Sequence, residues 1–246
     1  MQQWGYAITS ATAANSLTSL GARWWAVQER LRVAQHRFGR PPGSVVMLAA
    51  SKAQPVEYIR QLAALGQRAF GENYLQEACP KLDGCADLDL EWHFIGAIQG
   101  NKAAQVAQRF DWVHTLASEQ LALRLAAARP PARPPLNVCL QVNIDAEPSK
   151  AGVAPVAVAD LARAVARLPQ LRLRGLMAVP APASDFADQR RPLRALRELW
   201  LELRGQGFDL DTLSMGMSGD LEAAVAEGAT IVRIGTALFG PRPTRH

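Results

Sequence analysis

Short apolar runs alternate with longer segments of helical periodicity along most of the chain. Because a parallel crossover needs a helix-sized connection, this alternation predicts an α/β fold, a single (β/α)8 TIM-type barrel with an extra N-terminal helix. An open doubly wound sheet is the alternative. The expected strands are Val45–Ala50, Arg68–Phe70, Glu91–Ile95, Trp112–Thr115, Asn137–Ile144, Leu171–Ala178, Leu210–Leu213 and Thr230–Ile234. The expected helices are Leu17–Phe38, Val56–Leu65, Tyr74–Leu82, Asn101–Phe110, Glu119–Ala128, Val156–Leu168, Gln189–Arg204 and Gly219–Glu227.

The length of 246 residues suits one barrel, since such domains commonly occupy about 250 residues. Two stretches rich in proline, Pro41–Gly43 and Arg129–Pro135, are too short to be interdomain linkers. We therefore expect a flexible N-terminal tail over residues 1–16 and one barrel domain over residues 17–246.

Composition excludes several classes of protein. The net charge of +5 comes largely from arginines scattered through helical segments, which argues against a specific nucleic-acid partner. Cys79, Cys85 and Cys139 are odd in number and lack C-x-x-C spacing, so neither a disulfide framework nor a zinc site is indicated. The first 22 residues do not read as a signal peptide, and no apolar run is long enough to span a bilayer. We expect a cytoplasmic protein with no membrane partner.

Barrel enzymes and binding proteins carry their sites at the carboxyl ends of the strands. Lys52 ends the first apolar run, where a partly desolvated amine could attack a carbonyl group; a strand-end lysine that reaches water is the alternative. Small residues follow the seventh and eighth strands, Gly216 with Ser218 and Gly235 with Thr236. Loops at these two strand ends often bind phosphate through backbone N–H groups, although each glycine alone could simply make a turn.

Several motifs in this order make the chain similar to a known family. It resembles the pyridoxal phosphate homeostasis proteins, which are related in fold to the barrel domain of bacterial alanine racemase. The resemblance runs from about Leu31 to Gly240. The motifs are Ala50–Lys52, Phe70–Tyr74, Trp92–Gly96, Gln99–Lys102, Ser149–Gly152, Arg174–Met177, Leu213–Ser218 and Val232–Gly240.

The resemblance implies a pyridoxal 5'-phosphate (PLP) cofactor and assigns roles to residues of this chain. Lys52 would hold PLP as a Schiff base, and Arg233 would face the pyridine nitrogen. The remaining implied contacts are Ser218, Gly235 and Thr236 for the phosphate, Asn73 in the pocket, and Ser214, Met215 and Asn143 as weaker candidates. No catalytic residue and no metal ligand is assigned.

The sequence departs from the family pattern at three places. Ala53-Gln54 replaces a common Thr-Lys pair, Gly219 stands where an acidic residue is common, and Ala97 stands where proline is common. The first change removes any role of a second lysine; the others put only local loop geometry in doubt.

The resemblance further implies a non-catalytic binder in vitamin B6 homeostasis that stores PLP or delivers it. The expected partners are PLP-dependent apo-enzymes or B6 salvage enzymes, and we expect a monomer. The alternative is an alanine-racemase-like enzyme acting on small amino acids. Against it, only six residues follow Gly240, so we expect no room for the second domain of the racemases. A racemase also needs an acid–base group on each face of the substrate, and Tyr74 is the one candidate beside Lys52.

The sequence allows other interpretations of several of these residues. A barrel enzyme for phosphorylated metabolites could use the same phosphate loops without a Schiff base. His93 and His114 are expected to be hydrogen-bonded residues of the barrel rather than metal ligands. Lys150 could lie at the cofactor mouth or be solvated in the loop after the fifth strand.

Overall fold

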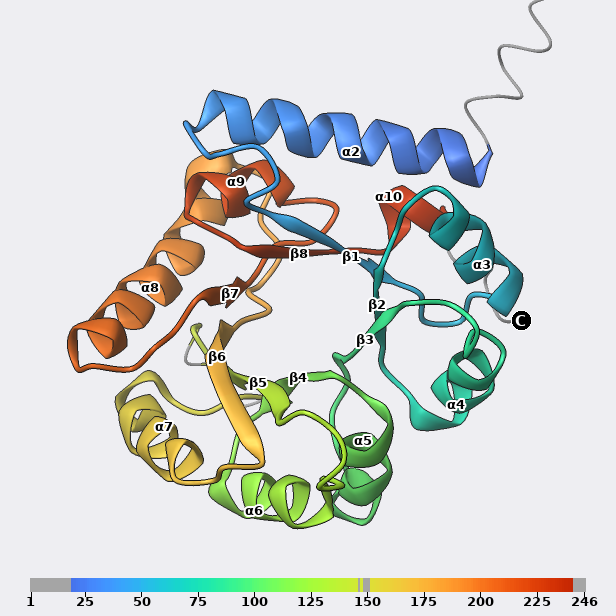
Figure 1. Cartoon of the computed structure of the whole chain (residues 1–246). Helices are drawn as coiled ribbons and strands as arrows, with labels where there is room; N and C mark the ends of the chain where they lie inside the picture. The colour runs from blue at the N-terminus through green and yellow to red at the C-terminus, as the bar shows by residue number, and fades with distance from the viewer. Residues whose placement is uncertain (1–18, 146, 148–150, 241–246) are drawn as a thin grey trace, which may run out of the picture.

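The strands form a closed parallel barrel in which each strand lies beside its neighbours in the sequence and β1 pairs with β8 (Figure 1). The computed structural model describes residues 19–145, 147 and 151–240. Its strands are β1 Val46–Ala50, β2 Ala69–Glu72, β3 Glu91–Phe94, β4 Trp112–Leu116, β5 Leu136–Gln141, β6 Leu171–Met177, β7 Thr212–Ser214 and β8 Ile231–Ile234. Closure of the barrel confirms the predicted fold class and excludes an open sheet.

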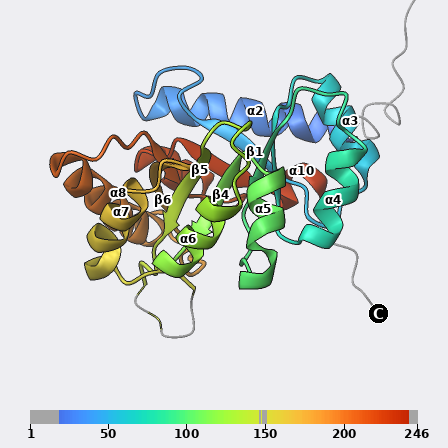
Figure 2. The same ribbon diagram turned by 60° about the horizontal axis from the view of Figure 1, so that its bottom comes forward.

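Helices form an outer layer around the barrel (Figures 1 and 2). They are α2 Leu20–Arg37, α3 Val56–Ala64, α4 Leu75–Asp83, α5 Ala103–Arg109, α6 Glu119–Ala128, α7 Val158–Ala166, α8 Phe186–Gly205, α9 Leu221–Ala226 and α10 Thr236–Phe239. Single 3₁₀ turns, Gly100–Lys102 and Pro155–Ala157, precede α5 and α7. Buried apolar side chains between these helices and the strands form the main core.

The extra N-terminal helix, α2, begins after Ser19, whose hydroxyl caps it by accepting the N–H of Ala22. It packs across the barrel exterior against α3, α9 and α10 (Figure 1). Trp24 is buried on this face, and its indole N–H donates to Oε1 of Gln67 at 3.2 Å. The predicted helix Leu17–Phe38 is thus confirmed within the described residues, whereas the tail predicted over residues 1–16 lies outside them.

Several predicted boundaries differ from the structure by a few residues, and two of these differences are accompanied by clear local interactions. Helix α8 begins at Phe186 rather than Gln189, because the Asp185 carboxylate accepts the N–H groups of Ala187 and Asp188 as an N-cap. Strand β5 ends at Gln141 rather than Ile144, and Val142 instead makes an isolated bridge to Val153.

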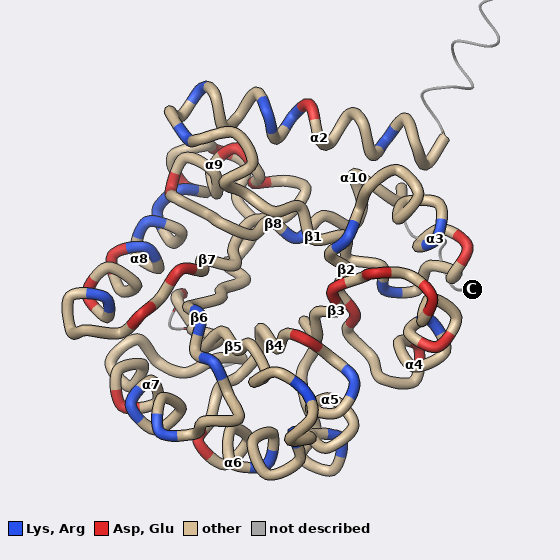
Figure 3. The backbone as a smooth tube through the Cα atoms, in the orientation of Figure 1, with Lys and Arg blue, Asp and Glu red and all other residues tan. Residues whose placement is uncertain are grey.

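Charged side chains lie on the outer helices and on the segments between them. Lys and Arg are spread over α2, α6, α7 and α8 rather than gathered in one place (Figure 3). The three cysteines are free. In the described part of the chain, no helix combines the length and the apolar character needed to cross a membrane.

A buried ion pair joins the carboxyl ends of β1 and β2 to α4. The Lys81 ammonium donates to Oε1 of Glu72 at 2.7 Å and to the Ser51 carbonyl oxygen at 2.8 Å. The Ser51 hydroxyl donates to the same Glu72 oxygen at 2.6 Å. Burial raises the pKa of the Glu72 carboxyl, and the hydrogen bonds from Lys81 and Ser51 offset part of that rise. Removing either Lys81 or Glu72 would leave the other charge buried without its counter-charge.

We predict that Lys81→Met lowers the free energy of unfolding by about 3–5 kcal/mol, because Glu72 would lose its buried counter-charge. The double variant Lys81→Met/Glu72→Gln should recover at least half of that loss, since neither charge remains. Urea unfolding followed by circular dichroism measures both values. Strictly additive losses in the double variant would contradict the ion-pair interpretation.

Candidate functional site

A cavity of about 420 Å³ opens at the carboxyl ends of the strands, a volume ordinary for small-molecule sites. Six of the eight predicted site residues line it: Lys52, Asn73, Ser218, Arg233, Gly235 and Thr236. They come from β8 and from the segments that follow β1, β2, β7 and β8. The other described lining residues are Ala50, Gln54, Ile95, Val179, Met217, Gly219, Phe239 and Gly240.

Lys52 lies in a tight turn directly after β1. The turn is closed by the N–H of Gln54, which donates to the Ser51 carbonyl oxygen at 3.0 Å. Ala53 adopts a left-handed backbone conformation with φ of 61°, unusual for a residue other than glycine, and its N–H donates to Glu77. Lys52 itself is half-buried, and its ammonium lies 5.7 Å from the centre of the Tyr74 ring. The turn thus presents a primary amine at the cavity wall.

Asn73 is held at the rim by a close approach of two backbone segments. A Cβ atom at Gly96 would lie 2.0 Å from the Asn73 carbonyl oxygen, so only glycine fits there. The carbonyl oxygen of Gly96 in turn accepts the Thr115 hydroxyl at 2.6 Å. The glycine that ends the motif Trp92–Gly96 is therefore required by this contact with the neighbouring loop.

The loops after β7 and β8 form the side of the cavity predicted to hold phosphate. The Ser218 hydroxyl accepts the N–H of Ala237 at 3.2 Å, which joins the two loops. A Cβ atom at Gly235 would meet nothing closer than 3.7 Å, and one at Gly219 nothing within 4 Å. These glycines leave open a space that side chains would fill. Such a cradle of small residues and hydroxyl groups fits a bound phosphate group.

Helix α2 braces both loops from outside. Arg30 pairs with Glu222 through two hydrogen bonds of 2.5 Å and donates to the Ser218 carbonyl oxygen at 2.7 Å. Arg23 donates to the Leu238 carbonyl oxygen at 2.7 Å. These arginines lie about 190 and 215 residues from the loops that they contact. Sequence reasoning did not find them, because no local pattern links them to the site.

Arg233 is buried in the barrel and faces the cavity from β8. Its guanidinium donates to the Ser214 carbonyl and hydroxyl oxygens at 2.6 and 2.8 Å and to the Ala178 carbonyl oxygen at 2.8 Å. Burial lowers the pKa of Arg233 to about 10, so the group stays charged at neutral pH. Arg233 is therefore a fixed donor at the cavity floor.

Two predicted residues, Ser214 and Met215, are fully buried and are not among the residues that line the cavity. Ser214 lies behind Arg233, where its hydroxyl contacts both Arg233 and His114. Met215 packs in the hydrophobic core. Asn143 is also away from the cavity lining and donates to the Glu147 carbonyl oxygen at 2.7 Å. Ser149 and Lys150 lie outside the described residues.

The two barrel histidines are hydrogen-bonded, as expected from the sequence. His93 and His114 are buried and hydrogen-bonded to each other, at 2.8 Å between Nδ1 of His93 and Nε2 of His114. Among the residues that the structure describes, no group of three histidine, cysteine or carboxylate side chains could hold a metal ion.

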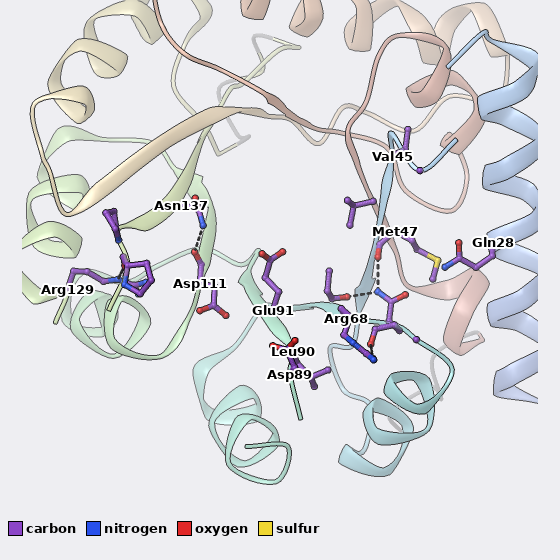
Figure 4. Close-up of a pocket in the computed structure, with 17 residues that line it drawn as sticks. Gln28, Val45, Met47, Arg68, Asp89, Leu90, Glu91, Asp111, Arg129 and Asn137 are labelled. Atoms are coloured by element: carbon purple, nitrogen blue, oxygen red, sulfur yellow. Dashed lines mark hydrogen bonds between the residues drawn. The ribbon is translucent and has the colours of Figure 1, made fainter. Parts of the chain in front are cut away.

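A second, larger cavity of about 750 Å³ lies at the opposite end of the barrel, where the strands begin (Figure 4). Glu91 lies in it between Asp111 and Arg68. It carries no grouping of small residues and hydroxyls like that around Ser218 and Gly235. The smaller cavity is the better candidate for a cofactor.

Comparison with known proteins identifies the family of the chain. Residues 24–243 match the family described as "Alanine racemase, N-terminal domain". A protein of Pseudomonas aeruginosa named pyridoxal phosphate homeostasis protein is 55% identical over 216 residues, which cover 88% of this chain and 93% of that protein. A protein of Escherichia coli with the same name is 47% identical over 219 residues, covering 88% and 94%.

Solved structures include a close relative with the cofactor in place. PipY of Synechococcus elongatus, determined with PLP bound, is 39% identical, with a TM-score of 0.75 over 85% of this chain and 98% of PipY. The family match over most of the chain, these identities and the shared barrel lead to one conclusion. The chain belongs to the pyridoxal phosphate homeostasis proteins, within the family of the alanine racemase N-terminal domain.

Proposed function

We propose that this protein binds PLP in the cavity at the carboxyl ends of the strands and takes part in vitamin B6 homeostasis by storing or delivering it. The observation that carries the proposal is the convergence of an amine, a fixed guanidinium and a cradle of small residues on one cavity. PLP carries an aldehyde, a pyridine nitrogen and a phosphate group, one for each of these features. The PLP-bound structure of PipY, from the same family, supports the match.

Lys52 is the proposed covalent anchor. Its Nζ would condense with the aldehyde carbon of PLP and release one water molecule, leaving a Schiff base. Ser218, Thr236 and the backbone of Gly235 would hold the phosphate, and Asn73 would contact the cofactor at the rim. Ser214 would act from behind the lining by accepting a hydrogen bond from Arg233. Met215 packs in the hydrophobic core, and a contact with the cofactor stays a prediction.

Arg233 is the proposed partner of the pyridine nitrogen. A guanidinium donates hydrogen bonds but cannot accept a proton at neutral pH, so it favours an unprotonated ring. An unprotonated ring withdraws electrons poorly, which suits storage better than amino-acid chemistry.

The composition of the cavity favours a carrier over an enzyme. Among the described lining residues, the ionisable ones are Lys52 and Arg233, whereas racemisation needs an acid–base group on each face of the substrate. The alternative, an alanine-racemase-like enzyme for small amino acids, is favoured by one observation, the position of the Tyr74 ring 5.7 Å from the Lys52 ammonium. Apo-enzymes and B6 salvage enzymes are the proposed partners. The cytoplasmic location and the monomeric state stay predictions.

Lys52→Ala should abolish the covalent adduct that borohydride traps after incubation with PLP, because the proposed anchor is removed. The sequence contains four lysines, so peptide mapping by mass spectrometry identifies the modified one. Lys102→Ala, which changes a lysine outside the cavity lining, serves as the control and should keep the adduct. An adduct of undiminished yield on another lysine in Lys52→Ala would refute the assignment.

Ser218→Ala and Thr236→Ala should each weaken PLP binding roughly ten- to 150-fold, because a hydrogen bond to a charged group contributes about 1.5–3 kcal/mol. The dissociation constant from a fluorescence or absorbance titration measures the effect. Pyridoxal, which lacks the phosphate, should bind equally well to the wild type and both variants. Unchanged PLP affinity in both variants would remove these residues from the phosphate site.

The storage role predicts delivery without turnover. Protein loaded with PLP and freed of excess cofactor should activate an apo-enzyme that requires PLP, and Lys52→Ala treated in the same way should not. The loaded protein should convert L-alanine, aspartate and lysine no faster than free PLP does. Sustained conversion of L- to D-alanine that is lost in both Lys52→Ala and Tyr74→Phe would instead establish the racemase-like enzyme.

A further inference from the structure

An uninterrupted series of hydrogen bonds crosses the barrel interior from the larger cavity to Arg233. It begins at Glu91, whose Oε1 lies 2.7 Å from Nε2 of His93. Nδ1 of His93 lies 2.8 Å from Nε2 of His114, and Nδ1 of His114 lies 2.7 Å from the Ser214 hydroxyl oxygen. That hydroxyl accepts a guanidinium N–H of Arg233 at 2.8 Å. We call this series the relay.

The inner members of the relay are shielded from water. His93, His114 and Ser214 are completely buried, and the indole ring of Trp112 stacks on His93 with ring centres 5.2 Å apart. The Glu91 end reaches solvent: 48% of its side chain is exposed in the cavity shown in Figure 4. At the other end, Arg233 faces the smaller cavity. Buried polar groups of this kind are costly unless each one keeps its hydrogen-bond partner.

The carboxylate end dictates the direction of the relay. The hydrogen bond from His93 lowers the pKa of Glu91, so Glu91 is a carboxylate at neutral pH and can only accept. Nε2 of His93 must therefore carry a proton. Burial lowers the pKa of His114 well below its ordinary value, so this ring is neutral.

The remaining proton positions follow from the Arg233 end. Arg233 can only donate, so the Ser214 hydroxyl accepts from it and, among the described residues, has Nδ1 of His114 as the remaining partner for its own proton. Nδ1 of His93 is unprotonated and accepts a hydrogen bond from the Nε2–H group of His114. Nδ1 of His114 is likewise unprotonated and accepts a hydrogen bond from the Ser214 hydroxyl group. The lone pairs of that hydroxyl are thereby turned toward Arg233, whose N–H they accept.

We propose that Glu91, His93 and His114 are positioning residues for Arg233: through Ser214 they hold its guanidinium in the orientation in which it meets the cofactor ring. This inference rests on the proposed function, since PLP is the ligand that Arg233 would meet. Loss of the Glu91 acceptor frees both histidines to take the opposite tautomer. The Ser214 hydroxyl would then accept from His114 as well as from Arg233, and its hold on Arg233 would weaken.

The direction of the relay is tested first, without cofactor. Long-range proton–nitrogen NMR spectra of the 15N-labelled wild type should show both Nε2 atoms protonated and both Nδ1 atoms bare. Glu91→Gln keeps an acceptor oxygen and should keep this pattern, whereas Glu91→Leu should change or mix the tautomers. The opposite pattern in the wild type would overturn the proposal.

The second arm measures PLP affinity in the same proteins. Glu91→Leu should raise the dissociation constant about two- to tenfold, the effect of one net hydrogen bond. Glu91→Gln and the control Asp89→Leu, which removes an exposed carboxylate from the same cavity, should leave it unchanged. In a Ser214→Ala background, Glu91→Leu should have no further effect, because the link to Arg233 is already cut.

The NMR and affinity measurements together distinguish the ways in which the proposal could be wrong. Unchanged affinity in Glu91→Leu with altered tautomers would overturn the positioning role. An equal loss in Asp89→Leu would attribute the effect to cavity charge and would also overturn it. Absence of PLP binding by the wild type would defeat the proposed function and, with it, the positioning of Arg233 toward PLP, while the tautomers would still test the direction of the relay.

Discussion

Pairing of β1 with β8 closes the barrel, and the site depends on the register of that pairing. Leu48 is aligned with Arg233 and Ala49 with Ile234. This alignment brings the turn that carries Lys52 beside the loop that carries Gly235 and Thr236, although the two lie at opposite ends of the sequence. Parallel strands fix the side-chain direction at each position, so a shift by one residue would turn Arg233 away from its present side of the strand.

Buried polar groups near the site are organised in two connected sets, one between the barrel and α4 and one inside the barrel. One set is the Glu72–Lys81 ion pair with Ser51, which fixes the strand end directly before Lys52. The other is the relay from Glu91 to Arg233. Unpaired polar groups are costly in the protein interior, so each set constrains the positions of its members. The first set includes Ser51, which directly precedes Lys52, and the second ends at Arg233; both Lys52 and Arg233 line the cavity. Lys52, the proposed covalent anchor, and the Arg233 guanidinium are thus both supported by buried polar groups.

Support from outside comes from α2. The arginines of this helix hold the loops after β7 and β8 by donating to the carbonyl oxygens of Ser218 and Leu238. Those loops supply the small residues of the proposed phosphate cradle. The extra N-terminal helix therefore supports the proposed phosphate site from outside the barrel.

The sequence by itself determined the barrel, the approximate strand positions and six of the fourteen described residues that line the cavity. Hydrophobic periodicity and turn residues are local properties of the chain, so they can be recognised without the tertiary structure. Glu119–Ala128 matches α6 at both ends, and Lys52 and Gly235 follow the strands as predicted. The N-cap at Asp185 is also a local signal, although it was not used. Only the tertiary structure decided that Ser214 lies behind Arg233, that Lys81 reaches Glu72, and that Arg30 braces the Ser218 loop. The partners His114 and Ser214 are 100 residues apart and meet because closure brings their strands to one interior, a proximity that no local pattern encodes.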